Sequence, residues 1–266
     1  MQEKPFDGGA VGIRPGHWRP EFEWEHIAWI LPPWPDSGHI CLDLPETVFT
    51  RVGETCTNQF LSHVNPNYPA LFPALPKIAW ESVPGGIAYE RVLPNGVRFG
   101  GSVVKGGPWV VALELYIENG SEEPLTSLRT QTCAFLKKTT DFSAPTNENK
   151  FVHTAEGGWV AMARLQPGES RPVGRWHAMG AGPVADLPVA ICVAEAENRL
   201  LAMTWFDDTA CLWGNEQHPC MHADPGLKDL APGERASARG EITFFDGPLE
   251  AYRPETGSGP AIGNRP

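Results

Sequence analysis

Hydrophobic and polar residues alternate with a period of two along much of the chain. The large apolar residues of 111–117 occupy every second position, and the stretch 127–136 alternates in the same way. This period is typical of a strand with one face in the core. The second stretch places Arg129, Gln131 and Cys133 on the same face. Because the two stretches flank a turn-rich run at 119–125, the sequence predicts that they form a β-hairpin.

Further strands are predicted where the same pattern recurs, at 87–93, 97–104, 189–194, 200–206 and 236–245. The first two flank Pro94-Asn95-Gly96, whose composition favours a hairpin turn. Helical periodicity is nearly absent, and no strand-then-helix alternation predicts a parallel sheet. The sequence therefore predicts an all-β fold, a single antiparallel β-sandwich.

The two ends of the chain differ from this pattern. Residues 1–38 interleave tryptophan with proline and predict an irregular segment that wraps the sandwich. Residues 254–266 are rich in glycine and proline and predict a flexible tail. The sandwich domain is thus expected over 39–253.

Composition and charge restrict which partners and which cellular compartment are expected. Of the 266 residues, 32 are acidic and 21 are basic, so the net charge of −11 disfavours nucleic acid and anionic membranes as partners. No apolar stretch is long enough for a spanning helix. The first residues lack the pattern of a signal peptide, which predicts a cytoplasmic protein, or a periplasmic or secreted one if a leader was removed. The six irregularly spaced cysteines are expected to be mostly buried thiols.

The run 215–224 carries the densest group of metal-binding and titratable side chains. Pro219 disfavours a helix, so the sequence predicts a loop that holds His218, His222 and Asp224. Imidazole binds transition metals and titrates near neutral pH. The loop is therefore expected to supply either ligands for a divalent metal, together with His63, or an acid–base pair. Histidines that only satisfy backbone groups are the structural alternative.

Two other polar runs suit sugar hydroxyls, which need paired donors and acceptors. The first, 58–67, contains His63 and Asn65, although Asx turns explain its asparagines equally well. The second, 146–153, contains Asn149, Lys150 and His153. If the polar face of 127–136 lines a concavity, these side chains are expected to converge there with Arg129 and Gln131. A solvated outer face is the alternative.

A resemblance adds to this interpretation. The runs 87–99, 113–125 and 130–136, with the later Leu230-Ala-Pro-Gly-Glu-Arg235, resemble the central and closing parts of galactose-mutarotase-like proteins. The resemblance implies a β-supersandwich with a concave sheet that faces a sugar. Where that family has a histidine-and-aromatic motif, this chain has Gln131-Thr-Cys133-Ala-Phe135, so the resemblance does not carry the mutarotase reaction over.

The function expected from these observations is carbohydrate binding on a concave sheet face, with histidine-based acid–base chemistry of an isomerase, lyase or glycoside hydrolase. His153 or His222 is the expected base and Arg129 the group that steadies substrate charge. The residues expected to bind the sugar are Gln131, Asn149, Lys150, Asn65, Trp24, Trp29 and Trp213.

Two alternatives stay open. One is a metal-dependent hydrolase or oxidase whose ligands are His63, His218, His222 and Asp224. The other is a glycan-binding module without turnover. A homo-oligomer is compatible with each of them.

Overall fold

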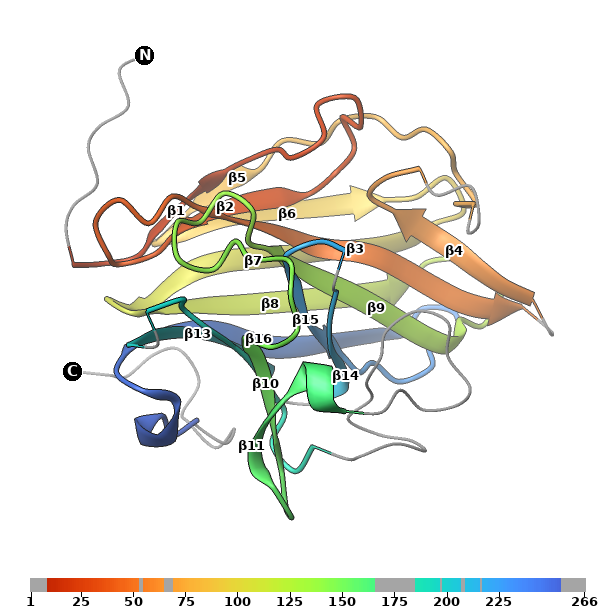
Figure 1. Ribbon diagram of the computed structural model, residues 1–266. Helices are drawn as coiled ribbons and strands as arrows, with labels where there is room; N and C mark the ends of the chain where they lie inside the picture. The colour runs from red at the N-terminus through yellow and green to blue at the C-terminus, as the bar shows by residue number, and fades with distance from the viewer. Residues whose placement is uncertain are drawn as a thin grey trace.

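A computed structural model describes residues 9–52, 55–64, 69–165, 185–196, 198–206, 209–215 and 217–254. Within this part of the chain almost every element is a strand, and the strands form two antiparallel sheets that pack face to face (Figure 1). The all-β sandwich predicted from the sequence is confirmed.

The seven-stranded sheet has the order β1-β2-β3-β9-β15-β14, and β4 pairs with β3 beside this path. Its strands are β1 (Gly12–Pro15), β2 (Ile27–Leu31), β3 (Ile40–Val52), β4 (Thr55–Leu61), β9 (Thr126–Phe135), β14 (Thr209–Gly214) and β15 (Cys220–Pro225).

The nine-stranded sheet has the order β11-β10-β12-β13-β16-β8-β7-β6-β5. Its strands are β5 (Glu81–Val83), β6 (Gly86–Val92), β7 (Val97–Gly107), β8 (Val110–Asn119), β10 (Lys150–Thr154), β11 (Gly158–Ala161), β12 (Val189–Val193), β13 (Arg199–Trp205) and β16 (Arg235–Asp246). Two short 3-10 turns, η1 (Met162–Arg164) and η2 (Leu249–Ala251), are the helical elements of the described residues, and neither has the length or apolar character to span a membrane.

The core lies between the inner faces of the two sheets. On the seven-stranded sheet, Leu42 and Ala134 point inward and meet residues such as Met203 and Trp205 of the other sheet. Each large apolar side chain buried in this way contributes about 1.5–3 kcal/mol. Because side chains alternate along a strand, the residues between these inward positions face outward. The outer face of the seven-stranded sheet therefore carries Asp43, Cys133 and their neighbours.

The predicted hairpin over 111–136 is wrong in its pairing, although both of its strands form. β8 pairs with β7 and β16, whereas β9 pairs with β3 and β15 in the other sheet. The turn between them crosses from one layer to the other. The side chain of Asn119 fixes this crossing, because its buried Nδ2 donates to the carbonyls of Glu123 (2.8 Å) and Leu230 (2.9 Å). Alternation predicted the strands, but it contains no information about their partners.

The N-terminal segment is partly regular. The apolar run 27–31 forms β2, which pairs with β3 and with β1. Between β1 and β2, residues 16–26 have no strand. His26 is buried and stacks on Tyr89 of the nine-stranded sheet, whereas the part around Trp18 lies against the outer face of the seven-stranded sheet. Trp18 stacks on Phe135 there, with 4.0 Å between ring centroids. Of the predicted tail, 254–266, only residue 254 lies among the described residues.

Candidate functional site

A row of four side chains crosses the outer face of the seven-stranded sheet. The strand registers pair Asp43 with Cys133, Cys133 with His222, and His222 with Trp213. These four residues come from β3, β9, β15 and β14, so one line of cross-strand neighbours spans the sheet. All four are buried, with exposed fractions of 8% or less. Such buried polar groups need partners, and their partners define the site.

Arg19 organises one end of this row. Its Nη2 donates to Asp43 Oδ2 (2.7 Å) and Ser62 Oγ (3.0 Å), and its Nε donates to Glu25 Oε2 (3.0 Å). Ser62 Oγ also donates to Asp43 Oδ2 (2.7 Å). Burial raises the pKa of Asp43 to about 8, although Arg19 and Ser62 favour the carboxylate. The irregular segment 16–26 is thus tied to β3 by charged hydrogen bonds.

Glu46 and His63 lie beside this network and keep some solvent exposure. Glu46 falls where the β3–β9 ladder shifts register between Asp43 and Thr47, and such irregularities re-aim side chains. Its Oε1 is 3.8 Å from His63 Nδ1, and the two side chains are 15% and 25% exposed. Burial raises the pKa of Glu46, whereas burial and Arg19 lower the pKa of His63 to about 4. His63 is therefore neutral at neutral pH, next to a carboxyl group that holds its proton more tightly than usual.

Cys133, Cys220 and His222 form a compact group on β9 and β15. The two sulfur atoms and a ring nitrogen of His222 all lie within 4.8 Å of one another. A hydrogen bond from Cys133 lowers the pKa of Cys220 to about 5 with the help of His222. Burial lowers the pKa of His222, but Asp224 and Cys220 outweigh it and raise that pKa to about 10.

Asp224 and Trp213 hold the His222 ring in place. Asp224 Oδ1 accepts from the backbone N–H of Thr132 (2.8 Å), and its Oδ2 accepts from Trp213 Nε1 (2.8 Å). The Trp213 ring stacks on the imidazole, with 3.6 Å between centroids and 18° between planes. His222 Nδ1 has no hydrogen-bond partner and is 3.6 Å from Asp224 Oδ1.

The predicted loop at 215–224 is wrong, because residues 220–225 form strand β15. The proline that disfavours a helix is compatible with a strand edge. In a strand, residues two apart share a face, so Cys220, His222 and Asp224 all lie on the outer face. The prediction of a loop leaves out this alternation, and with it the outward position of Cys220.

The structure brings some of the predicted site residues together. Arg129, which is exposed, and Gln131, which is half-buried, lie on the outer face of β9 with Cys133. Gln131 accepts a hydrogen bond from Thr47 Oγ1. His63, His222 and Asp224 belong to the same face.

Other predicted residues lie apart from this group. His153, on β10 of the nine-stranded sheet, hydrogen-bonds Asp186 (2.6 Å), and Asn149 and the buried Lys150 are at the start of the same strand. His218 is exposed and is not one of the three clustered ligand atoms, although it lies beside Cys220, whose backbone N–H donates to the His218 carbonyl (2.7 Å). The expected convergence of 146–153 with Arg129 and Gln131 is therefore not seen. Asn65 falls outside the described residues.

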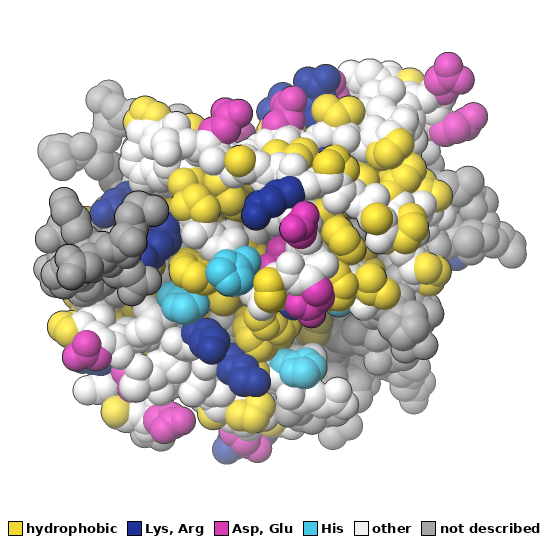
Figure 2. All heavy atoms as spheres, turned by 90° about the horizontal axis from the view of Figure 1, so that it is seen from above, with side chains coloured by type: hydrophobic (Ala, Val, Ile, Leu, Met, Phe, Trp, Pro, Cys, Tyr) yellow, Lys and Arg dark blue, Asp and Glu magenta, His cyan; other side chains and the backbone are white. Residues whose placement is uncertain are grey.

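The predicted sugar-stacking tryptophans have structural partners. Trp24 Nε1 donates to the carbonyl of Leu61 (3.0 Å), and Trp29 Nε1 donates to that of His17 (3.0 Å). Both rings are half-buried, whereas Trp213 is 8% exposed and stacks on His222. On the face of the molecule seen in Figure 2, histidine side chains lie near basic, acidic and apolar ones. Titratable and apolar side chains are thus neighbours on this face of the molecule.

Arg19, Glu46 and Cys220 were not predicted as site residues. Arg19 lies 24 positions before Asp43 and 43 before Ser62, so no local pattern links them. The signal for Cys133 and Cys220 was present, since each stands at an outward position of an alternating run.

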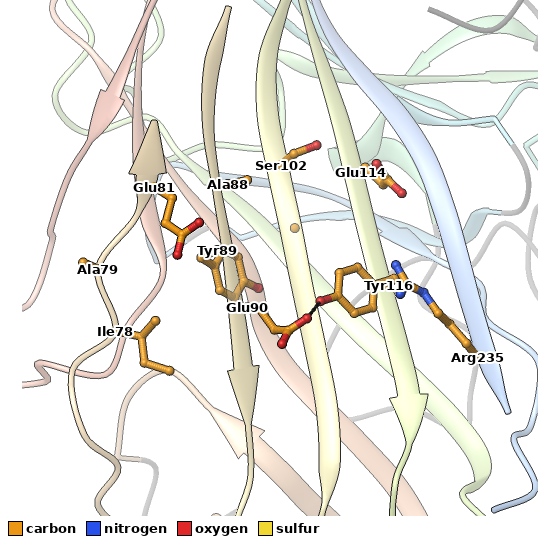
Figure 3. Close-up of a pocket in the computed structure, with 11 residues that line it drawn as sticks. Ile78, Ala79, Glu81, Ala88, Tyr89, Glu90, Ser102, Glu114, Tyr116 and Arg235 are labelled. Atoms are coloured by element: carbon orange, nitrogen blue, oxygen red, sulfur yellow. Dashed lines mark hydrogen bonds between the residues drawn. The ribbon is translucent and has the colours of Figure 1, made fainter. Parts of the chain in front are cut away.

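A depression of about 500 Å³ lies on the outer face of the nine-stranded sheet (Figure 3). Tyr116 Oη donates to Glu90 Oε2 (2.5 Å), and the Arg235 guanidinium lies 3.7 Å from the centre of the Tyr116 ring. Burial and Glu90 raise the pKa of Tyr116 to about 12. Arg98 forms a further ion pair with Glu90 at 3.3 Å. Because these groups satisfy one another, the outer face of the seven-stranded sheet is the stronger candidate.

Comparisons with known proteins return similar structures but no family. No family model and no curated protein match the chain. A putative aldose 1-epimerase from Escherichia coli K12 is 10% identical over 89% of this chain and 100% of its own, with a TM-score of 0.46. A GalM/aldose epimerase homologue from C. elegans is 10% identical over 90% and 100%, with a TM-score of 0.45. A polysaccharide lyase is 12% identical over 91% of this chain and 33% of its own, with a TM-score of 0.42.

These values are too low to transfer a reaction or a site residue. Function has to be argued from the side chains of this chain.

Proposed function

We propose that this protein is a carbohydrate-active enzyme that moves protons on a sugar bound at the outer face of the seven-stranded sheet. Glu46 and His63 are the proposed acid and base. The observation that carries the proposal is their pairing at 3.8 Å, with both side chains partly exposed beside a buried charged network. The sugar itself is proposed from the family resemblance of the sequence and from the aromatic and amide residues near this face.

The pKa values of the two groups are shifted in opposite directions, upward for Glu46 and downward for His63. The raised pKa of Glu46 suits a proton donor, and the lowered pKa of His63 keeps its ring neutral, as a proton acceptor requires. His63 Nδ1 also lies 3.3 Å from Ser62 Oγ, which helps to orient the ring. Sugar isomerisation, lyase chemistry and glycoside hydrolysis each need a proton removed at one atom and supplied at another. A carboxyl–imidazole pair suits that requirement.

When His63 takes a proton and Glu46 gives one, the attraction between the two resulting charges offsets the low pKa of His63. Transfer leaves an imidazolium and a carboxylate 3.8 Å apart. Two unit charges at that distance attract by about 4 kcal/mol at an effective dielectric constant of 20, and by less where solvent screens them. The pair therefore stabilises the charges that its own chemistry creates.

Side chains around the Glu46–His63 pair are proposed to orient the sugar and the charges that act on it. Arg19 is fixed by Glu25 and Asp43, so its positive charge stays at one place beside His63. Arg129 and Gln131, on the outer face of β9, remain the proposed contacts for sugar oxygens. Half-buried Trp24 is the proposed apolar border.

The test is a substrate panel with matched variants. It measures anomer interconversion of freshly dissolved α-D-glucose and α-D-galactose by polarimetry, unsaturated product from a polyuronate by ultraviolet absorbance, and nitrophenol release from nitrophenyl glycosides. Glu46→Gln and His63→Gln are compared with the wild type, and Glu90→Gln on the other sheet is the control.

We expect turnover in one of these assays and a loss of about 100-fold or more in both site variants, because acid–base catalysis contributes about 10²–10⁴-fold. Glu90→Gln should keep the wild-type rate. Full activity in either site variant refutes the assignment. No turnover on any substrate overturns the enzyme proposal, and retained binding on a glycan array would then indicate a glycan-binding module.

A further inference from the structure

We propose that Cys133, Cys220 and His222 form a binding site for a zinc(II) ion on the outer face of the seven-stranded sheet. This inference does not depend on the proposed acid–base function, since neither Glu46 nor His63 is among the ligands. It also differs from the ligand set expected from the sequence, which contained no cysteine.

The ligand atoms already lie close to the positions that a metal requires. Zinc binds sulfur at about 2.3 Å and imidazole nitrogen at about 2.0–2.1 Å, so tetrahedral ligands are about 3.5–3.8 Å from one another. Here the three atoms all lie within 4.8 Å of one another. Small rotations of the side chains are sufficient to close the difference, and the strands need not move.

The strand register disfavours a disulfide between the two cysteines. Cys133 faces His222 directly, whereas Cys220 faces Phe135, two residues further along β9. The cysteines are thus diagonal neighbours, for which the separation in a ladder is about 7 Å. A disulfide needs Cβ atoms about 3.5–4.5 Å apart. A metal ion placed between the two sulfur atoms can bind both cysteines at this separation, whereas an S–S bond requires the two side chains to be closer.

The imidazole is held by neighbouring side chains, and its Nδ1 lies on the side of Asp224. His222 is 1% exposed, and its Nδ1 has no hydrogen-bond partner. Asp224, held by Thr132 and Trp213, lies 3.6 Å from that nitrogen. A carboxylate behind a ligating histidine is a common arrangement in zinc sites. It fixes the ring and leaves the other nitrogen to face the metal.

The donor set selects the metal. Two thiolates and an imidazole suit zinc and disfavour calcium and magnesium, which prefer oxygen ligands. Three protein ligands leave a fourth tetrahedral position for water or another donor.

The test uses the full-length, tag-free protein after removal of metal by a chelator. Zn²⁺ is titrated in competition with a chromophoric chelator, and Co²⁺ is added separately as a spectroscopic probe. Cys133→Ser, Cys220→Ser and His222→Gln are compared with Cys192→Ala, which removes a fully buried thiol from β12 in the core. Circular dichroism reports whether each variant is folded.

We expect one zinc per chain and, with Co²⁺, a thiolate charge-transfer band with tetrahedral ligand-field bands. Each ligand variant should lose more than about 100-fold in affinity, since loss of an outer-shell partner alone costs about 10–100-fold. Cys192→Ala should bind as the wild type does. If a variant does not fold, the Co²⁺ spectrum of the wild type still shows whether thiolates bind the metal.

Three results would overturn the site. They are a Co²⁺ spectrum without a thiolate band, zinc affinity unchanged in a folded ligand variant, or an intact mass two hydrogens lighter that shows a Cys133–Cys220 disulfide. Turnover is a separate readout, so an absent zinc site leaves the Glu46–His63 proposal standing, and the reverse also holds.

Discussion

Replacing Arg19 by methionine removes the cation that organises the outer face of the seven-stranded sheet while keeping an unbranched side chain of similar reach. Arg19 is 12% exposed, and its carboxylate partners Asp43 and Glu25 are 2% and 4% exposed. Removing one member of a buried ion pair costs about 3–5 kcal/mol, because the remaining charge is buried without compensation. We expect Arg19→Met to destabilise the fold by that amount at pH 8.

Arg98→Met is the matched control. Arg98 also pairs with two carboxylates, Glu90 at 3.3 Å and Glu118 at 4.0 Å, but these side chains are 33–50% exposed. Exposed pairs contribute about 0–1 kcal/mol. Urea unfolding of both variants, with equal m values, measures the difference.

The cost of Arg19→Met also depends on pH. Burial already raises the pKa of Asp43, and loss of Arg19 raises it further. The folded state then binds more protons than the unfolded state between the unfolded and folded pKa values, so stability falls as pH rises through that window. The wild type shares this slope below the pKa of its own Asp43, about 8, so the deficit of the variant should be smaller at pH 7 than at pH 9. Equal costs for the two arginine variants, or a deficit that grows on acidification, would refute this reasoning.

Three other outcomes are expected. Asn119→Ala should lose about 2–3 kcal/mol of stability in urea unfolding, since it removes two side-chain hydrogen bonds to carbonyl groups; a change below 0.5 kcal/mol, within the ordinary range of surface substitutions, would contradict its role in the layer crossing. Zinc at about 100 times its dissociation constant should stabilise the wild type by about 2.7 kcal/mol in a thermal-shift assay, and His222→Gln should show no shift. The acidic limb of kcat/KM should lie near pH 4, the lowered pKa of His63, because the base must be neutral; a limb near pH 6.5 would exclude His63 as that base.

The sequence predicted the strands well because one buried face imposes a period of two. The stretch 127–136 shows this clearly, since β9 covers 126–135 and the faces of Arg129, Gln131 and Cys133 are as expected. Pairing was less predictable. β8 and β9 are consecutive, yet the long-range bond from Asn119 to the Leu230 carbonyl, 111 positions away, separates them into different sheets.

The candidate site was predicted only in part, for a similar reason. His222 and Asp224 stand in one short polar run, so their proximity is visible in the sequence. Glu46 and His63 meet because β3 pairs with β4, and Arg19 joins them because the N-terminal segment folds back over β3. Glu46 reaches the outer face at a register shift, which no alternating pattern predicts.

The most direct test of the account compares turnover in Glu46→Gln and Glu90→Gln on the substrate that the panel identifies. Both substitutions remove one carboxylate from the outer face of a sheet, but only Glu46 is paired with a neutral imidazole. We expect a loss of about 100-fold or more for Glu46→Gln and an unchanged rate for Glu90→Gln. A reversed pattern would move the active site to the nine-stranded sheet, and equal rates would contradict the central claim.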